Sequence, residues 1–336
     1  MTGSPRVAVV VPVHNDLSRT VRFLESFRAV DYTNYSIVVV DDGSTDETAA
    51  VLAERFRHVV RLPGSGNLWW AGATNRGVRW ALRNRFDYVL TINNDSRVSP
   101  GFLRNLVDAA RAHPRSIVGS RIDILEQPGV VWALGSQMIW EKGEIFQLRQ
   151  HGEAIPEGGA ALQPVEALTG CGTLVPSDCY REIGYYDAVH YPQYHADAEF
   201  VMRALRRGWQ AFVSTRAVVW NDVPNSAADK VRNWFGWIFS RRSAVYWRPL
   251  LAIHLTYCPH RLRLHSLWQY YGWYFWRNDE RIQKLGWILR PLTNWWVSLE
   301  QRLRDGVKAS SIERYAKHRH TAADDSHEPQ VTERAA

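Results

Sequence analysis

Residues 38–46 read Val-Val-Val-Asp-Asp-Gly-Ser-Thr-Asp, and this stretch decides the fold. Three consecutive β-branched residues are typical of a strand that is buried on both faces. The two aspartates and the glycine that follow favour a turn. A buried strand that ends in an acidic turn is typical of a parallel sheet crossed by helices, in which ligands bind at the carboxyl ends of the strands.

Strands and helices alternate on both sides of this stretch. Upstream, residues 6–13 form a short β-branched run, and apolar residues at 17, 21, 24 and 27 have the spacing of one helix face. Downstream, we predict a helix over 47–56, a strand over 58–62, a helix over 68–82 and a strand over 88–92. This alternation predicts an α/β fold built from βαβ units, with a mixed, mainly parallel sheet flanked by helices.

Two further acidic motifs occur along the chain. Asn93-Asn94-Asp95 follows the strand predicted over 88–92, and Asp197 and Glu199 lie at the start of a helix predicted over 198–207. Carboxylates at the ends of two successive strands, with a third ahead of a helix, predict that a nucleotide, a metal and a base meet at one edge of the sheet.

The ordered series of motifs resembles family 2 of the glycosyltransferases, which have the GT-A fold, a Rossmann-like nucleotide-diphospho-sugar transferase fold. The series spans about residues 6–222 and comprises residues 11–15, 40–46, 67–77, 93–95, 170–172, 183–187 and 197–208. Asn-Asn-Asp at the metal position resembles bacterial enzymes that add rhamnose or galactofuranose to cell-surface polysaccharides. The resemblance implies an inverting, metal-dependent transfer of a sugar from a UDP- or dTDP-linked donor to a hydroxyl of a glycan or lipid-linked acceptor in cell-envelope polysaccharide synthesis.

Asp95 is the candidate metal ligand. Mn²⁺ or Mg²⁺ at a diphosphate is held by one or two protein carboxylates, phosphate oxygens and water, and it neutralises the charge of the leaving group. By resemblance Asp95 is the last acid of the DxD motif, and Asn93 stands where many members have the first. The alternative is that Asp95 only caps the helix that follows. Many relatives complete the metal site with a histidine after the last core strand, where this chain has Asn221 and Asp222.

Residues for the donor nucleotide follow from the same resemblance. Asp42 is expected to accept the N3–H of a uracil or thymine ring, and its alternative role is to accept loop amides in a turn. Arg76 is expected to pair with the diphosphate, and its alternative is a solvated helix face. The complete predicted donor set is Pro12, His14, Asp41, Asp42, Arg76 and Asn94.

Asp197 is the predicted general base. An inverting transfer needs a carboxylate to take the proton of the acceptor hydroxyl. In the family pattern an arginine lies six residues after this acid, as Arg203 does here, although Ala196 replaces the preceding acid. Glu199 is expected to brace the loop or bind acceptor. The alternative for Asp197 is a helix N-cap.

The acceptor side is predicted between the two halves of the chain. Residues 130–134 and 138–140 look like a β-hairpin or a bent strand within an insertion over 123–168, which in this fold borders the acceptor. The glycine at Gly170, followed by Cys171, permits close backbone approach. Asp187 resembles an acid that contacts acceptor, with turn formation as its alternative.

Basic and aromatic residues are concentrated in the last third of the chain. Residues 230–319 contain 17 Lys or Arg against 5 Asp or Glu, and nine of the 16 Trp. This composition suits helices on the inner leaflet of a membrane. The alternative is a helical cap on the catalytic domain or on a second subunit, as in a homodimer. The longest apolar stretch, residues 244–258, is too short and too polar to span a bilayer.

The predicted organisation is a catalytic domain over 1–228, a basic Trp-rich helical appendage over 229–319 and a disordered tail over 320–336. Three cysteines without metal-ligand spacing, and no signal peptide, indicate a cytoplasmic protein, peripheral on the inner membrane. Basic aromatic segments also resemble single-stranded nucleic-acid platforms, but the repeats or small barrels of such modules are missing, so no nucleic-acid partner is predicted. A non-catalytic sugar-nucleotide scaffold and a sugar nucleotidyltransferase are the alternative functions. Nucleotidyltransferases usually carry a Gly-rich loop and a Lys after the first strand, and this chain has neither at that place.

Overall fold

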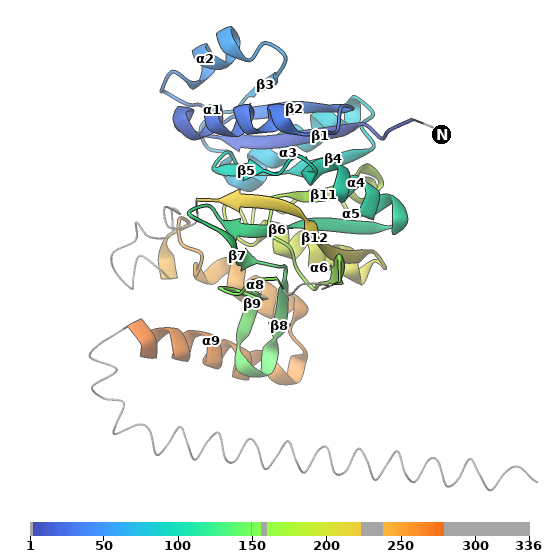
Figure 1. The fold of residues 1–336 in the computed structure, drawn as a ribbon. Coiled ribbons are helices and arrows are strands. Elements are labelled where there is room, and N and C mark those ends of the chain that lie inside the picture. The colour runs from blue at the N-terminus through green and yellow to red at the C-terminus, as the bar shows by residue number, and fades with distance from the viewer. Residues whose placement is uncertain (1–2, 149, 156–159, 223–237, 279–336) are drawn as a thin grey trace, which may run out of the picture. The chain divides into compact units, whose positions relative to one another are not determined.

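The computed structural model describes residues 3–148, 150–155, 160–222 and 238–278. Within these ranges a ten-stranded mixed sheet carries helices on both faces (Figure 1). The α/β prediction is therefore confirmed.

The first half of the chain builds four parallel strands. β1 pairs with β2 on one side and with β4 on the other, and β2 pairs with β3. The elements are β1 (Val7–Val13), α1 (Leu17–Ser26), η1 (Phe27–Ala29), β2 (Tyr35–Asp41), α2 (Thr48–Arg55), β3 (Val60–Pro63), α3 (Trp69–Arg83) and β4 (Tyr88–Thr91). They follow the predicted alternation closely, because β1 and β2 are runs rich in β-branched residues and turn residues separate the strands from the helices.

The second half extends the sheet with both strand directions. β11 runs antiparallel between β4 and β6, and β12 runs parallel to β6 on its other side. The elements are β5 (Ser96–Val98), α4 (Phe102–Ala112), β6 (Ser116–Ile124), β7 (Gln127–Ala133), β10 (Leu162–Pro164), β11 (Thr173–Pro176) and β12 (Gln210–Asn221). The strand order is β10-β12-β6-β11-β4-β1-β2-β3.

Side chains from the two faces of the sheet form two hydrophobic clusters. Alternate residues of β1 point to opposite faces, as the pleat requires. Val7, Val9 and Val11 pack with α1 and α4, whereas Ala8 and Val10 pack with the cluster that includes α3, α5 (Ser177–Ile183) and α6 (Ala196–Arg206). α3 carries the predicted site residue Arg76, and α6 carries Asp197 and Glu199. The two helices therefore cover the same face of the sheet.

The insertion after β6 differs from a simple hairpin. β7 pairs with β6, whereas β8 (Ser136–Ile139) leaves the main sheet and pairs with β9 (Glu144–Leu148) through the short helix η2 (Trp140–Lys142). Gly135 has a φ of +70°, which turns the chain between the two strands. The prediction of a β-hairpin between 130–134 and 138–140 is therefore wrong, because these segments do not pair with each other. The chain bends between them, as in the alternative prediction of a bent strand.

Helices α8 (Trp247–Tyr257), η5 (His260–Leu262) and α9 (Arg263–Asn278) follow. The first compact unit runs from Met1 to Tyr271, so α8 packs in the same unit as the sheet, and a second unit starts at Gly272 within α9. The predicted domain boundary at 228 and the predicted tail over 320–336 lie outside the described residues. None of the described helices has the length and hydropathy needed to span a bilayer.

Candidate active site

The ends of β1 and β2 bring the predicted nucleotide-binding residues together. The register aligns Val13 with Asp41, and the next amide, that of Asp42, donates to the Val13 carbonyl at 2.8 Å. The ring of His14 donates from Nδ1 to the Asp42 carbonyl at 2.7 Å. The Asp41 carboxylate accepts the amide of Ser44 at 3.0 Å. These residues lie side by side, as strand order alone predicts.

The Asp42 carboxylate holds the loop that leads into α3. It is 6% exposed and accepts the amides of Gly66 and Leu68, each at 2.8 Å, and of Trp69 at 3.2 Å. Trp69 has a φ of +57°, a left-handed conformation that is costly for a bulky residue and is found where surrounding contacts enforce it. The loop-amide alternative is thus observed, and base recognition by Asp42 stays a prediction.

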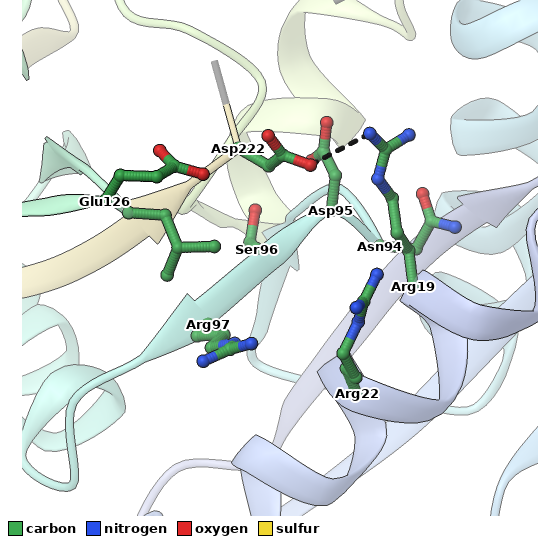
Figure 2. A pocket seen from close by; sticks show the side chains of 9 residues that line it. Arg19, Arg22, Asn94, Asp95, Ser96, Arg97, Glu126 and Asp222 are labelled. Atoms are coloured by element: carbon green, nitrogen blue, oxygen red, sulfur yellow. Dashed lines mark hydrogen bonds and ion pairs between the residues drawn. The ribbon is translucent and has the colours of Figure 1, made fainter. Parts of the chain in front are cut away.

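A cavity of about 240 Å³ opens beside the end of β4 (Figure 2). It is lined mainly by charged and polar side chains from α1, from the β4–β5 loop, from β5, from the β6–β7 turn and from the residue after β12. The lining residues are Arg19, Arg22, Asn94, Asp95, Ser96, Arg97, Leu125, Glu126 and Asp222. Arg76, in contrast, is exposed on α3 and does not line this cavity, so its pairing with a diphosphate stays a prediction.

Asp95 presents a buried oxygen without a partner to this cavity. Its Oδ1 accepts no hydrogen bond from any described residue. Burial, the largest influence, raises the pKa of Asp95, while the nearby Arg19 guanidinium lowers it, with a net shift upward. A buried carboxylate oxygen without a hydrogen-bond donor is a costly arrangement that a bound cation would relieve.

Asp222 is the second carboxylate of the cavity. Its Oδ2 accepts a hydrogen bond from Arg19 Nη2 at 2.9 Å, and Figure 2 shows its carboxylate beside that of Asp95. Asn221 instead points into the protein, where its amide contacts Cys171 Sγ at 3.5 Å. Of the two residues that stand in place of a histidine, Asp222 is the one that lines the cavity.

Asp95 and Asp222 fit a divalent cation at a diphosphate. Such an ion needs only one or two protein carboxylates, because phosphate oxygens and water complete its shell. Within the described part of the chain, no group of three or more His, Cys, Asp or Glu side chains is arranged to hold a metal.

The two asparagines before Asp95 have separate contacts. Asn94 donates to Thr20 Oγ1 at 3.0 Å, which ties the β4–β5 loop to α1 at the edge of the cavity. Asn93 accepts the indole N–H of Trp70 at 2.9 Å. Asn93 thus binds the protein itself at the position where many relatives carry the first acid of the motif.

Asp197 is held by two backbone amides at the start of α6. Its Oδ2 accepts the amide of Gly170 at 2.5 Å, and its Oδ1 accepts that of Ala198 at 2.8 Å. The helix begins at Ala196, two residues earlier than predicted, so Asp197 lies in the first turn and His195 takes the N-cap position. Burial raises the pKa of Asp197 more than the amides and His195 lower it. A carboxylate with a raised pKa is a stronger proton acceptor than one in water.

His195 is fixed by three features. Its φ of +70° is left-handed, its ring stacks on Phe146 of β9 with centroids 4.9 Å apart, and its Nε2 donates to the Ala244 carbonyl at 2.6 Å. Burial lowers the pKa of His195, which favours the neutral ring. The β8–β9 insertion therefore reaches to within two residues of Asp197.

Trp70 connects the loop that carries Asp95 with the loop that carries Gly170, whose amide binds Asp197. A Cβ at Gly170 would lie 2.1 Å from Trp70 Cζ2, so the indole packs directly on the Gly170 backbone. The same indole donates to Asn93 and meets the ring of Tyr186 edge-on at 5.3 Å. The Trp70 side chain thus joins Asn93, beside Asp95, to Gly170, whose amide binds Asp197.

Glu199 braces α6 against α8. It is 6% exposed, and its Oε1 accepts from Arg203 Nε at 3.1 Å and from the Tyr257 hydroxyl at 2.7 Å. These contacts hold α6 against α8. Bracing of the loop and contact with an acceptor both stay predictions for Glu199.

Asp187 forms a turn by accepting the amides of Val189 and His190 at 3.0 Å. Burial raises the pKa of Asp187, but the hydrogen bonds from His190 and Val189 lower it, and the net shift is downward.

Cys171 lies beneath Asp95 and away from the surface. It is 4% exposed, and its Sγ lies 3.1 Å from Ser96 Oγ. Burial raises the pKa of Cys171 to about 11. The glycines on either side allow this packing, since a Cβ at Gly172, where φ is +78°, would lie 2.1 Å from Ser120 Oγ. An acceptor contact by the Cys171 side chain stays a prediction.

The sequence predicts no site role for Trp70 or for six residues that line the cavity: Arg19, Arg22, Ser96, Arg97, Leu125 and Glu126. Arg19 and Trp70 only fall within segments whose pattern predicts a helix. Asp16 and Arg19 do have the spacing of a one-turn ion pair, which the structure shows at 3.3 Å. No local pattern connects Arg19 with Asp222, which lies 203 residues away.

Known proteins resemble this chain in sequence. The profile of the family described as Glycosyl transferase family 2 matches residues 8–169. A Mycobacterium tuberculosis protein described as uncharacterized is 26% identical over 162 residues, 48% of this chain and 56% of the relative. The N-acetylglucosaminyl-diphospho-decaprenol L-rhamnosyltransferase of the same species is 25% identical over 236 residues, 62% of this chain and 73% of the relative. The chain thus spans little more than half the length of the first of these relatives.

Solved structures resemble it in fold. A structure of GalNAc-T7 with UDP, GalNAc and Mn²⁺ superposes with a TM-score of 0.53 at 16% identity, over 65% of this chain and 43% of that one. Staphylococcus aureus TarS, residues 1–349, superposes with a TM-score of 0.50 at 13% identity, over 80% and 72%. At these identities the likeness concerns the fold. Residues 8–169 therefore belong to glycosyltransferase family 2, within a chain that has the GT-A fold.

Proposed function

We propose that this chain is an inverting glycosyltransferase of cell-envelope polysaccharide synthesis. It transfers a sugar from a UDP- or dTDP-linked donor to a hydroxyl of a glycan or lipid-linked acceptor. The observation that carries the proposal is the contact chain from Asn93 through Trp70 and Gly170 to Asp197. It holds the Asp197 carboxylate, the proposed proton acceptor, at a fixed position relative to the loop that bears Asp95, and that loop lies within the residues that match family 2.

On the donor side, the ends of β1 and β2 provide a backbone cradle for the nucleoside. The Asp42 carboxylate orders residues 66–69, and the His14 ring joins the two strand ends by its hydrogen bond to the Asp42 carbonyl. In this arrangement the protein groups that meet the base and ribose are set before the donor binds. Preformed sites lose less entropy when a ligand binds.

The cavity beside Asp95 takes the diphosphate. Asp95, with its unpartnered Oδ1, and Asp222 would hold a Mn²⁺ or Mg²⁺ ion there. When bound, such an ion stabilises the negative charge that develops on the leaving diphosphate. Arg97 lines the same cavity and adds positive charge near the leaving group.

At the base, the acceptor hydroxyl gives its proton to Asp197. The acceptor oxygen forms a bond to the anomeric carbon as the bond from that carbon to the diphosphate oxygen breaks, and the nucleoside diphosphate leaves with the electron pair. The amides of Gly170 and Ala198 keep the carboxylate oriented, and its raised pKa suits the proton transfer. Attack from the face opposite the leaving group inverts the anomeric centre.

A lipid-linked acceptor would place the protein at the cytoplasmic face of a membrane. The mycobacterial rhamnosyltransferase that this chain resembles is named for a decaprenol-linked acceptor. Among the described residues, α8 and the first turns of α9 expose Trp247, Leu255, Leu264 and Trp268, the last two at 83% and 69%. Residues 238–278 contain six arginines and no Asp or Glu, which favours an anionic lipid surface.

Flotation with vesicles tests the membrane part of the proposal. Wild-type protein should bind vesicles of phosphatidylglycerol and phosphatidylcholine but not pure phosphatidylcholine. Leu264→Ser with Trp268→Ser should lower binding several-fold, because exposed apolar side chains supply the insertion. Equal binding of wild type and variant would exclude this surface.

Thermal stability with nucleotides tests the transferase part. UDP, dTDP, GDP and CMP are added with and without Mn²⁺, since a ligand that binds only the folded state raises the melting temperature. A metal-dependent shift with UDP or dTDP is expected. Asp197→Asn should keep that shift and abolish transfer, because the amide has nearly the shape of the carboxylate but cannot accept the proton. Turnover close to wild type in this variant would show that Asp197 is not the base.

A further inference from the structure

Arg19 lies where a cation would meet the two carboxylates of the cavity. It comes from the first turn of α1, and its guanidinium extends to Asp222, as Figure 2 shows. Arg19 Nη2 lies 2.9 Å from Asp222 Oδ2, and Arg19 Nη1 lies 3.3 Å from Asp16 Oδ2. The side chains of Arg19 and Asp222 are 27% and 17% exposed, so solvent screens this pair less than a surface ion pair.

The side chains that line the cavity carry equal numbers of positive and negative formal charges. Its lining contains three arginines and three carboxylates, whose formal charges cancel. A divalent cation therefore adds two positive charges, the number of negative charges on the diphosphate of a sugar nucleotide. The cavity is electrically suited to take the metal and the diphosphate together, and not the metal alone.

Arg19 and a metal compete for Asp222. Asp222 Oδ2 accepts the Arg19 N–H, and a divalent ion held by Asp95 and Asp222 would be repelled by the adjacent guanidinium. Asp16 offers Arg19 a second anchor on its own helix. The guanidinium has five N–H donors, so it can leave Asp222, keep Asp16 and take a phosphate oxygen.

We infer that Arg19 exchanges partners during donor binding: it pairs with Asp222 in the donor-free protein and with the donor diphosphate once the metal occupies the two carboxylates. This inference rests on the proposed function. Its consequence is that metal and nucleotide bind with strong positive coupling, because each removes an obstacle to the other. Arg19 is a binding residue for the diphosphate that also keeps free metal out.

The experiment measures Mn²⁺ affinity by electron paramagnetic resonance, with and without saturating UDP, and in parallel with dTDP. The ratio of the two dissociation constants is the coupling factor. Arg19→Gln should tighten Mn²⁺ binding about tenfold without nucleotide and lower the coupling factor by about tenfold or more, within the usual range for coupled ligands. The measurement requires neither the donor sugar nor the acceptor.

Arg22→Gln is the matched control. Arg22 is on the next turn of the same helix and lines the same cavity, so the variant removes the same charge but leaves the Arg19–Asp222 pair in place. We expect its Mn²⁺ affinity and coupling factor to change by less than about threefold, since only screened longer-range electrostatics are altered. Arg19→Lys, with one compact charge, should lie between wild type and Arg19→Gln. Circular dichroism melting confirms that each variant is folded.

The outcomes separate the inference from the function beneath it. Unchanged donor-free Mn²⁺ affinity in Arg19→Gln, or equal effects of the Arg19 and Arg22 variants, would overturn the partner exchange while metal-dependent UDP or dTDP binding still supported the transferase. Tighter donor-free Mn²⁺ binding in Arg19→Gln together with an unchanged coupling factor would also overturn the partner exchange. Wild-type protein that binds neither nucleotide with metal would defeat the proposed function and the inference together.

Discussion

Gly170→Ala tests whether Trp70 sets the position of the base. The new Cβ would lie 2.1 Å from Trp70 Cζ2 and 2.4 Å from Cη2, whereas ordinary contacts begin at 3.4 Å. The indole or the Gly170 loop must therefore move by about 1.3 Å. The indole resists because it donates to Asn93 and packs on Tyr186, so the displacement falls in part on the amide that holds Asp197.

The expected loss follows from that displacement. Forcing an extra methyl group into a packed site costs about 1–3 kcal/mol, and a 1 Å misplacement of reacting groups lowers the rate about 100-fold. For a unit of this size, we expect a melting temperature lower by about 2–10 °C. Calorimetry measures the first effect without knowledge of the substrate, and transfer from the donor identified by the nucleotide screen measures the second.

Gly72→Ala is the matched control for this change. It lies on α3 two residues after Trp70, and its added Cβ would meet only Leu68 side-chain atoms, at 3.3 and 3.8 Å. Its stability should stay the same or rise by up to about 1 kcal/mol, as helical glycines replaced by alanine usually do. Trp70→Phe combined with Gly170→Ala should cost less than the sum of the two single changes. A Gly170→Ala protein that melts within 1 °C of wild type and turns over within about twofold would refute the link through Trp70.

Three further changes have expected outcomes. Asp95→Ala should abolish the stabilisation by UDP or dTDP with Mn²⁺ in a thermal melt, whereas a metal-dependent shift of wild-type size would remove Asp95 from the cation site. Because burial raises the pKa of Asp197, and only the ionised form accepts a proton, kcat/KM should fall as pH drops through that raised value. The acid limb therefore lies above the ordinary aspartate pKa of about 3.9, and a rate that stays flat down to pH 4 would contradict the assignment. Tyr257→Phe removes the hydroxyl that Glu199 accepts at 2.7 Å, so stability should fall by about 1–2 kcal/mol in urea unfolding; no change would mean that α8 does not brace α6 through this bond.

Local patterns in the sequence predict much of the first half of the fold. The strands ending at Val13 and Asp41, and the strand that precedes Asn93, are β-branched runs closed by turn residues, so their ends and order can be read directly. Since parallel strands align their carboxyl ends, the meeting of His14 with Asp42 is predictable as well.

The remainder depends on contacts that sequence spacing does not encode. The pairing of Arg19 with Asp222 joins residues 203 positions apart, and Trp70 meets Gly170 through tertiary packing. The positive φ at Gly135 redirects β8 into a separate ribbon, which apolar alternation alone cannot show. α6 begins at Ala196, two residues before the predicted start. Its N-cap His195 adopts a left-handed conformation that few non-glycine residues take, so the sequence does not indicate this start.

The strand order has a practical consequence for the family 2 match, which ends at residue 169. β6 and β4 are not neighbours in the sheet: β11, residues 173–176, lies between them and hydrogen-bonds to both. A fragment cut at residue 169 would hold two separate pieces of sheet, and the nine-residue strand β6 would expose both a main-chain edge and apolar side chains. β12 pairs with the edge of β6 opposite to β11. During synthesis, residues up to 221 must therefore leave the ribosome before β12 can pair with β6. Expression trials that follow the boundaries of sequence similarity should therefore yield aggregates, and the smallest soluble piece should include β12.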